Sequence, residues 1–110
     1  MATFTIDPAP TFVAATRLTV PGAATPGVIN VEWRHQGRKA FKRWVESLAD
    51  TTDADALEGV MAGWDVGDSK GASVPFSREA LETLLDGYPA AGGELFDAYV
   101  KALHESRLGN

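Results

Sequence analysis

Few side chains in this sequence have the types and spacing that chemistry requires. His35 and His104 are its only histidines and it has no cysteine, so the three or four converging ligands of a zinc site are not indicated. Asp65 and Asp68 could act as a carboxylate pair in acid–base catalysis. They fall in a loop rich in glycine and serine, and no surrounding apolar pocket is indicated that would raise a pKa. We therefore expect no metal, no cofactor and no enzymatic activity.

The acidic run from Asp50 to Asp55 is the nearest match to a metal-binding motif. A calcium loop would need glycine at its sixth position and glutamate at its twelfth, where this sequence has Asp55 and Met61. Helix capping is the better interpretation, because carboxylates are favoured in the first turn of a helix. The serines show no nucleophile elbow, and the glycines form no phosphate-binding loop.

A cluster of basic residues is the strongest candidate for a binding site. The residues up to Arg43 include six basic and two acidic side chains, whereas those from Trp44 onward include four basic and thirteen acidic ones. Two surfaces of opposite charge favour fast, oriented association with a protein partner. A solvated helix face is a simpler interpretation, and nucleic-acid binding is a third that the acidic remainder of the chain disfavours. The cluster comprises Arg34, Arg38, Lys39, Lys42 and Arg43.

Trp33, directly before this cluster, is our candidate anchor for a partner. Tryptophan and tyrosine are prominent in binding hot spots, and Trp33 falls in a predicted hairpin whose edge could accept another strand. For Trp44, Trp64 and Phe96 we expect positions in the core. The hairpin edge and the charge segregation also favour self-association as a homo-oligomer. The predicted partner-binding residues are therefore Trp33, Arg34, Arg38, Lys39, Lys42 and Arg43.

Length and composition limit what the chain can be. With 110 residues, 45% of them hydrophobic and 23% charged, it should fold as a single domain, residues 1–110. No segment reaches the roughly 18 consecutive apolar residues of a membrane span. The N-terminus lacks the basic start and apolar run of a signal peptide. We expect a cytoplasmic protein without a membrane partner.

The N-terminal third of the chain predicts an arm and a hairpin. Residues 1–10 contain two prolines and little periodicity, and should form an extended arm. Residues 11–36 contain two alternating apolar stretches separated by a turn with two Pro-Gly dipeptides, which predicts an antiparallel β-hairpin. The expected strands are 12–20 and 28–35.

The remainder, residues 37–110, predicts about four short helices. Apolar side chains recur there at i, i+3, i+4 and i+7, the spacing of an amphipathic helix. Thr52 and Ser77 are placed as N-caps, and Arg107 as part of the last turn. The expected fold class is mainly α with a small N-terminal β-hairpin (α+β). Two sets show the helical spacing most clearly: Leu57, Val60, Met61 and Trp64, and Leu81, Leu84, Leu85 and Tyr88.

The second half of the chain also carries an ordered series of short motifs. They are Gly63-Trp64-Asp65, Phe76-Ser77-Arg78-Glu79, Tyr88-Pro89 and Ala98-Tyr99. In this order they resemble the tail assembly chaperone family of long-tailed bacteriophages, and the likeness extends from Phe4-Thr5-Ile6-Asp7-Pro8 to Leu108-Gly109-Asn110. The chain departs from that pattern in a longer loop, 66–75, and in Gly92-Gly93.

The resemblance implies a role in tail morphogenesis of a phage or prophage. Chaperones of this family bind the long, helical tape measure protein, help recruit tail tube subunits, and leave before the virion is complete. By this resemblance the chain is a non-catalytic chaperone in the cytoplasm of the bacterial host, absent from the mature virion. The alternative, from a different class, is a structural tail-completion or connector subunit that stays in the virion.

Overall fold

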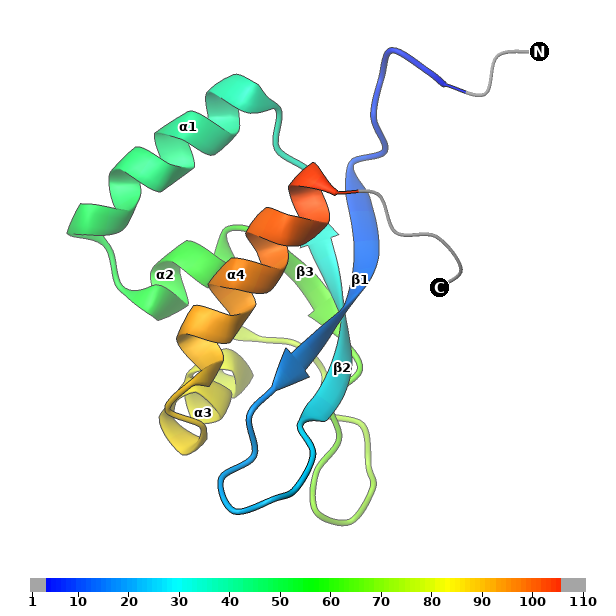
Figure 1. Cartoon of the computed structure of the whole chain (residues 1–110), viewed down its shortest axis with the longest axis vertical. Helices are drawn as coiled ribbons and strands as arrows, with labels where there is room; N and C mark the ends of the chain where they lie inside the picture. The colour runs from blue at the N-terminus through cyan, green and yellow to red at the C-terminus, as the bar shows by residue number, and fades with distance from the viewer. Residues whose placement is uncertain (1–3, 106–110) are drawn as a thin grey trace.

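The computed structural model describes residues 4–105 as one antiparallel sheet with helices on one of its faces (Figure 1). The strands are β1 (Thr11–Leu18), β2 (Gly27–Arg34) and β3 (Met61–Trp64), paired in the order β1-β2-β3. The helices are α1 (Arg38–Ser47), α2 (Asp53–Glu58), α3 (Arg78–Gly87) and α4 (Ala91–His104), and a 3₁₀ turn (Leu48–Asp50) follows α1.

The expected fold class, mainly α, is wrong. The protein is 22% strand and 42% helix and has an α+β fold, because the sheet has a third strand that the sequence did not reveal. The predicted hairpin followed by helices is otherwise close to the observed arrangement. Arg107, expected in the last turn of α4, lies outside the described residues.

The hairpin of β1 and β2 is confirmed. Thr11 pairs with Arg34 and Leu18 with Gly27, and Gly22 supplies the positive φ of 82° that the connecting turn needs. One face of the hairpin is buried and the other is open, as is common for antiparallel sheets. The buried face includes Thr16, Leu18, Val31 and Trp33, whereas Val13 and Val28 on the open face are exposed.

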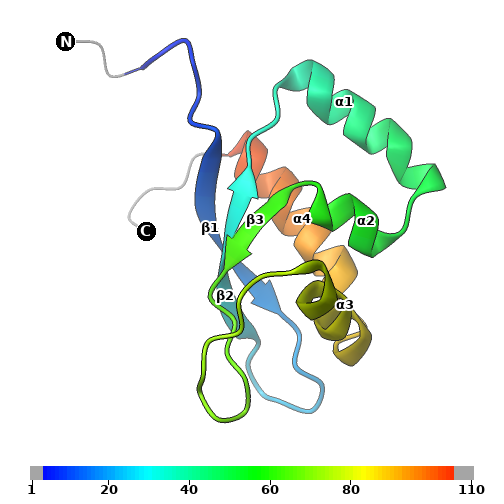
Figure 2. The same ribbon diagram turned by 180° about the vertical axis from the view of Figure 1, so that it is seen from behind.

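The third strand replaces the second half of the helix predicted through Trp64. β3 lies beside β2 (Figure 2). Met61 pairs with Trp33 and Trp64 pairs with Val31, and the register shifts between them so that Ala62 is an extra residue in β3. This bulge puts Met61 and Trp64, three residues apart, on the same side of the strand. The spacing that predicts a helix is therefore produced here by a bulged strand.

The predicted helix starts are confirmed at two positions. The Thr52 hydroxyl accepts a hydrogen bond from the Asp55 N–H at 3.2 Å, and the Ser77 hydroxyl accepts one from the Ala80 N–H at 3.0 Å. Each bond satisfies an N–H group that has no partner inside the helix. No helix among residues 4–105 is both long and apolar enough to cross a membrane.

Trp33, predicted to be an exposed anchor, is completely buried in the core. It lies on the central strand, where its ring packs against Tyr99 with centroids 5.0 Å apart. The prediction of an exposed Trp33 is therefore wrong. Trp33 is the largest apolar side chain of the hairpin, and burying it stabilises the folded state more than leaving it in water would. Trp44, Trp64 and Phe96 pack against the core and are partly buried.

Replacing Trp33 tests this core. We expect Trp33→Ala to lower the free energy of unfolding by about 3–5 kcal/mol, because it leaves a large cavity. Trp33→Phe should cost considerably less, since the indole Nε1 has no hydrogen-bond partner among residues 4–105. Urea unfolding followed by circular dichroism gives both values. Val13→Ala, on the open face of the same sheet, is the control, and a loss as small as that control for Trp33→Ala would contradict the core position.

Candidate functional site

The basic cluster forms one exposed surface at the start of α1, and we call it the basic face. Arg34 ends β2, and the other four residues lie on α1, which begins four residues later. Successive residues of a helix advance by about 100°, so Arg38 and Lys42 are neighbours on one side and Lys39 and Arg43 lie beside them. All five side chains are exposed: Arg34, Arg38, Lys39, Lys42 and Arg43.

The opposite side of α1 carries the aromatic residues that attach it to the body. The ring of Trp44 packs edge-on against Tyr99 at 5.3 Å and lies 5.6 Å from Phe96, and its Nε1 donates to the Ala56 carbonyl at 3.1 Å. Phe41 packs against His104 at 4.9 Å. No residue of α1 is fully buried, so these contacts alone fix the direction of the basic face.

The basic face has no acidic partner within residues 4–105. Every salt bridge within residues 4–105 involves Arg78 on α3. Its guanidinium lies 2.6 Å from Asp55, 3.0 Å from Glu58 and 3.2 Å from Glu82. The side-chain hydrogen bonds from Arg78 lower the pKa of Asp55, and the charge of Arg78 offsets one of these three negative charges. On α1, four basic residues are accompanied by one acidic residue, Glu46, and none of the five is in a salt bridge within residues 4–105.

An apolar groove of about 390 Å³ borders α1 on its apolar side. Val45 and Val100 line it, and their side chains are 43% and 38% exposed, so apolar surface reaches solvent next to Lys42. A partner with an apolar stripe and acidic flanks would match both features. The other residues that line it include Trp44, Leu48, Ala56 and Phe96, with Asp53 and Asp97 as its acidic members.

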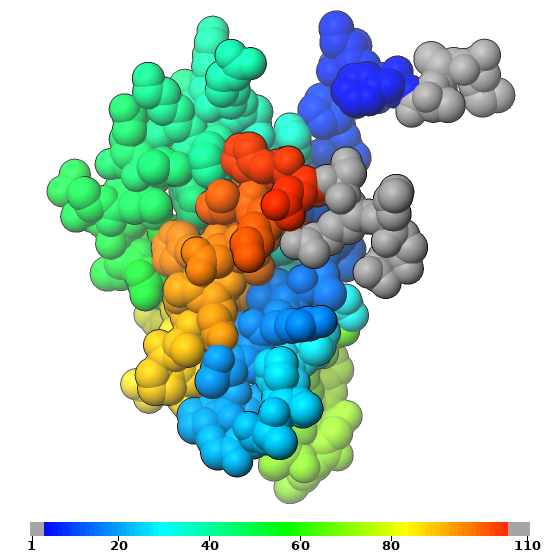
Figure 3. Space-filling model, in the orientation of Figure 1, coloured from blue at the N-terminus to red at the C-terminus, as the bar shows by residue number. Residues whose placement is uncertain are grey.

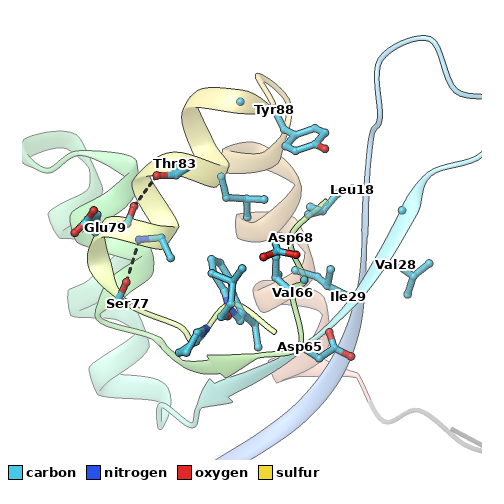
Figure 4. A pocket seen from close by; sticks show the side chains of 18 of the residues that line it. Leu18, Val28, Ile29, Asp65, Val66, Asp68, Ser77, Glu79, Thr83 and Tyr88 are labelled. Atoms are coloured by element: carbon cyan, nitrogen blue, oxygen red, sulfur yellow. Dashed lines mark hydrogen bonds between the residues drawn. The ribbon is translucent and has the colours of Figure 1, made fainter. Parts of the chain in front are cut away.

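A larger apolar groove, which we call the α3 groove, lies at the other end of the sheet (Figure 4). Its volume is about 990 Å³, within the range of ligand pockets. It is enclosed by the C-terminal end of β1, the N-terminal end of β2, the loop after β3, and α3. Its lining includes Leu18, Ile29, Trp64, Val66, Leu84 and Tyr88.

The loop after β3 is organised by hydrogen bonds that shape the α3 groove. Trp64 Nε1 donates to the Val74 carbonyl at 2.7 Å, and the Val74 N–H donates to the Val66 carbonyl at 2.8 Å. One Asp68 carboxylate oxygen accepts the N–H groups of Lys70 and Ala72, both at 2.9 Å. Asp68 is therefore engaged in building the loop.

The companion carboxylate Asp65 also has a structural partner. Its oxygens accept the backbone N–H and the side-chain Nδ2 of Asn30 at 2.7 and 2.8 Å. These bonds favour the ionised form and lower the pKa of Asp65, which is the opposite of what a general acid requires. Residues 4–105 contain no cluster of three or more histidines and carboxylates able to hold a metal.

Sequence reasoning placed the basic face but missed both grooves. Each groove is lined by residues from several elements that are distant in the chain, so no local spacing marks it. The sequence does contain one signal for the smaller groove. A helical wheel puts Val45 beside Arg38 and Lys42, at the edge of the apolar side of α1, and this position predicts partial exposure.

Comparison with known proteins gives one family. A family model described as phage tail assembly chaperone matches residues 1–110, the whole chain. No curated protein and no solved structure matches the chain.

The hydrogen bonds of Asp65 predict a pH-dependent contribution to stability. Since its pKa is lowered in the folded state, this contribution is complete above the ordinary aspartate pKa of about 3.9 and is lost as the pH falls through the lower folded value. We expect Asp65→Asn to cost about 1 kcal/mol or less at neutral pH, because the pair is exposed.

Thermal unfolding at a series of pH values from 7 to about 2 measures this effect. The melting temperatures of the wild type and Asp65→Asn should converge in acid. Asp86→Asn, at an exposed aspartate on α3, is the matched control and should differ little from the wild type at any pH. A constant difference for Asp65→Asn down to the lowest pH would contradict the role of its charge.

Proposed function

The chain belongs to the phage tail assembly chaperone family, and we propose that it is a non-catalytic chaperone that binds the tape measure protein and helps recruit tail tube subunits. The observation that carries this proposal is the match of the family model over the whole chain. We further propose that the protein acts in the cytoplasm of the bacterial host and leaves before the virion is complete.

The basic face of α1 is the proposed contact with the client. Unpaired exposed charges of one sign attract a partner of the opposite sign and orient it during encounter. A tape measure protein is long and helical, so its segments can present acidic residues beside an apolar stripe. Such a segment would set its acidic side against Lys42 and its neighbours, and its apolar stripe against Val45 and Val100.

This arrangement supports reversible binding. An interface that relies on exposed charges and a small apolar groove buries little surface and is weakened by salt. A chaperone that must release its client needs such an interface. A subunit that stays in the particle would be expected to use a larger and more apolar contact.

Co-expression with the neighbouring tail proteins tests the proposal directly. The tagged chain, produced together with the tape measure and tube proteins, should retain the tape measure protein in a pull-down, and finished particles should lack the chain. If it is stoichiometric in purified particles, it is a structural tail-completion or connector subunit, and the proposed function is wrong.

Charge reversal tests the proposed surface. We expect the double variant Arg38→Glu, Lys42→Glu to weaken tape measure binding at least about tenfold at low salt, with a shallower salt dependence than the wild type. The double variant Arg17→Glu, Lys70→Glu changes the net charge equally at exposed positions away from α1, and should bind nearly normally. Equal losses in both variants, measured by titration at several salt concentrations, would show that only net charge matters.

A further inference from the structure

The N-terminal arm exposes two large apolar side chains. Phe4 is 86% and Ile6 is 93% exposed, the highest values among the large hydrophobic residues of the described chain. Figure 3 shows the described part of the arm, residues 4–10, standing clear of the body beyond the start of β1. Its base is held by a hydrogen bond of 2.9 Å from the His35 N–H to the Pro10 carbonyl. Two such side chains in one short segment are a binding element rather than scattered surface.

The arm is stiffened where it joins the body. Pro8 and Pro10 fix two φ angles, and the Thr5 hydroxyl donates to the Asp7 carbonyl at 2.9 Å. A segment that is restricted before it binds loses less conformational entropy when it docks. The arm therefore offers Phe4 and Ile6 at low entropic cost.

The α3 groove is the apolar surface that could receive these side chains. Its lining is mostly apolar, and it is large enough for a phenylalanine and an isoleucine together. It lies beyond Leu18, at the opposite end of β1 from the arm (Figures 1 and 4). An apolar arm and an apolar groove thus occupy the two ends of one molecule.

The arm is too short to reach the α3 groove of its own chain. The eight residues of β1 separate the two by about 23 Å at about 3.3 Å per residue. The six residues from Phe4 to Ala9 span about 17 Å even when fully extended, and they would have to turn back at Pro10. The groove of a second copy carries no such constraint.

We infer that the arm of one copy docks Phe4 and Ile6 into the α3 groove of a second copy. The contact is heterologous, since the arm and the groove are different surfaces, and it leaves one free arm and one free groove on every pair. Repetition of the contact builds head-to-tail chains or closed rings rather than a two-fold dimer. This inference goes beyond the proposed function, because it does not use the basic face of α1.

Two variants separate the arm from the groove. The arm variant Phe4→Ser, Ile6→Ser changes only exposed side chains. The groove variant Gly87→Arg adds a side chain at a helical residue of the groove lining where a Cβ would meet nothing within 4 Å. Gly93→Arg, a helical glycine with equally open surroundings but outside the groove, is the matched control. Circular dichroism and melting temperature establish that each variant is folded.

Analytical ultracentrifugation over a range of concentrations gives the result. The wild type and Gly93→Arg should show concentration-dependent association, while the arm and groove variants should each remain monomeric. An equimolar mixture of the two should form a one-to-one dimer and nothing larger, because only one intact arm and one intact groove can meet.

Three outcomes would overturn the inference. They are a wild type that is monomeric up to its solubility limit, association that survives either variant, and a mixture of variants that fails to dimerise. The basic face is unchanged in all these proteins, so failure here is distinguishable from failure of the proposed function.

Discussion

The structure depends on Tyr99, whose ring lies between two tryptophans from different parts of the fold. Its centroid is 5.0 Å from that of Trp33 on the central strand and 5.3 Å from that of Trp44 on α1. Its hydroxyl donates to the Arg34 carbonyl at 2.8 Å, at the point where β2 ends and the chain turns toward α1. Burial raises the pKa of Tyr99 to about 12, so the hydroxyl keeps its proton as a donor. One side chain of α4 thereby joins the sheet, the chain leaving it, and α1.

The contacts of Tyr99 lie between two surfaces of different character, one charged and one apolar. At one end, α1 carries charges whose direction is set by the aromatic contacts beneath them. At the other end, the α3 groove is built by the end of β1, the start of β2, the loop after β3, and α3; β2 is shared, and its far end carries Arg34 of the basic face. The stable core between the two ends means that a contact at one surface need not disturb the other. On the two proposals above, the protein would hold a client at one end and a second copy at the other at the same time.

The sequence predicted the features that depend on local chemistry. Thr52 and Ser77 act as caps because a hydroxyl needs only the next turn of backbone to do so. The strands of the hairpin follow from alternation within each of them. The prediction of helix through Trp64 was wrong because a bulge at Ala62 reproduces the helical spacing, and only pairing with β2 distinguishes the two. Trp33 was predicted to be an anchor because tryptophan is prominent in binding hot spots and the hairpin edge could accept another strand. Its burial depends instead on Tyr99, 66 positions later. The grooves, likewise, exist only once distant elements are assembled.

The distribution of charge explains why a protein with a net charge of −5 can still present a positive surface. Several of its acidic side chains are already engaged: Asp55, Glu58 and Glu82 with Arg78, Asp65 with Asn30, and Glu94 with the backbone N–H and hydroxyl of Thr19. The hydrogen bonds from Thr19 lower the pKa of Glu94, so this carboxylate stays ionised and is held in place by its donors. The basic side chains of α1 have no comparable partners within residues 4–105. Hydrogen bonds from Asn30 and Thr19 hold Asp65 and Glu94 without cancelling their charge, and Arg78 cancels one charge among three carboxylates. The positive surface therefore exists because four basic side chains lie within six positions of α1, apart from the acidic majority of the chain.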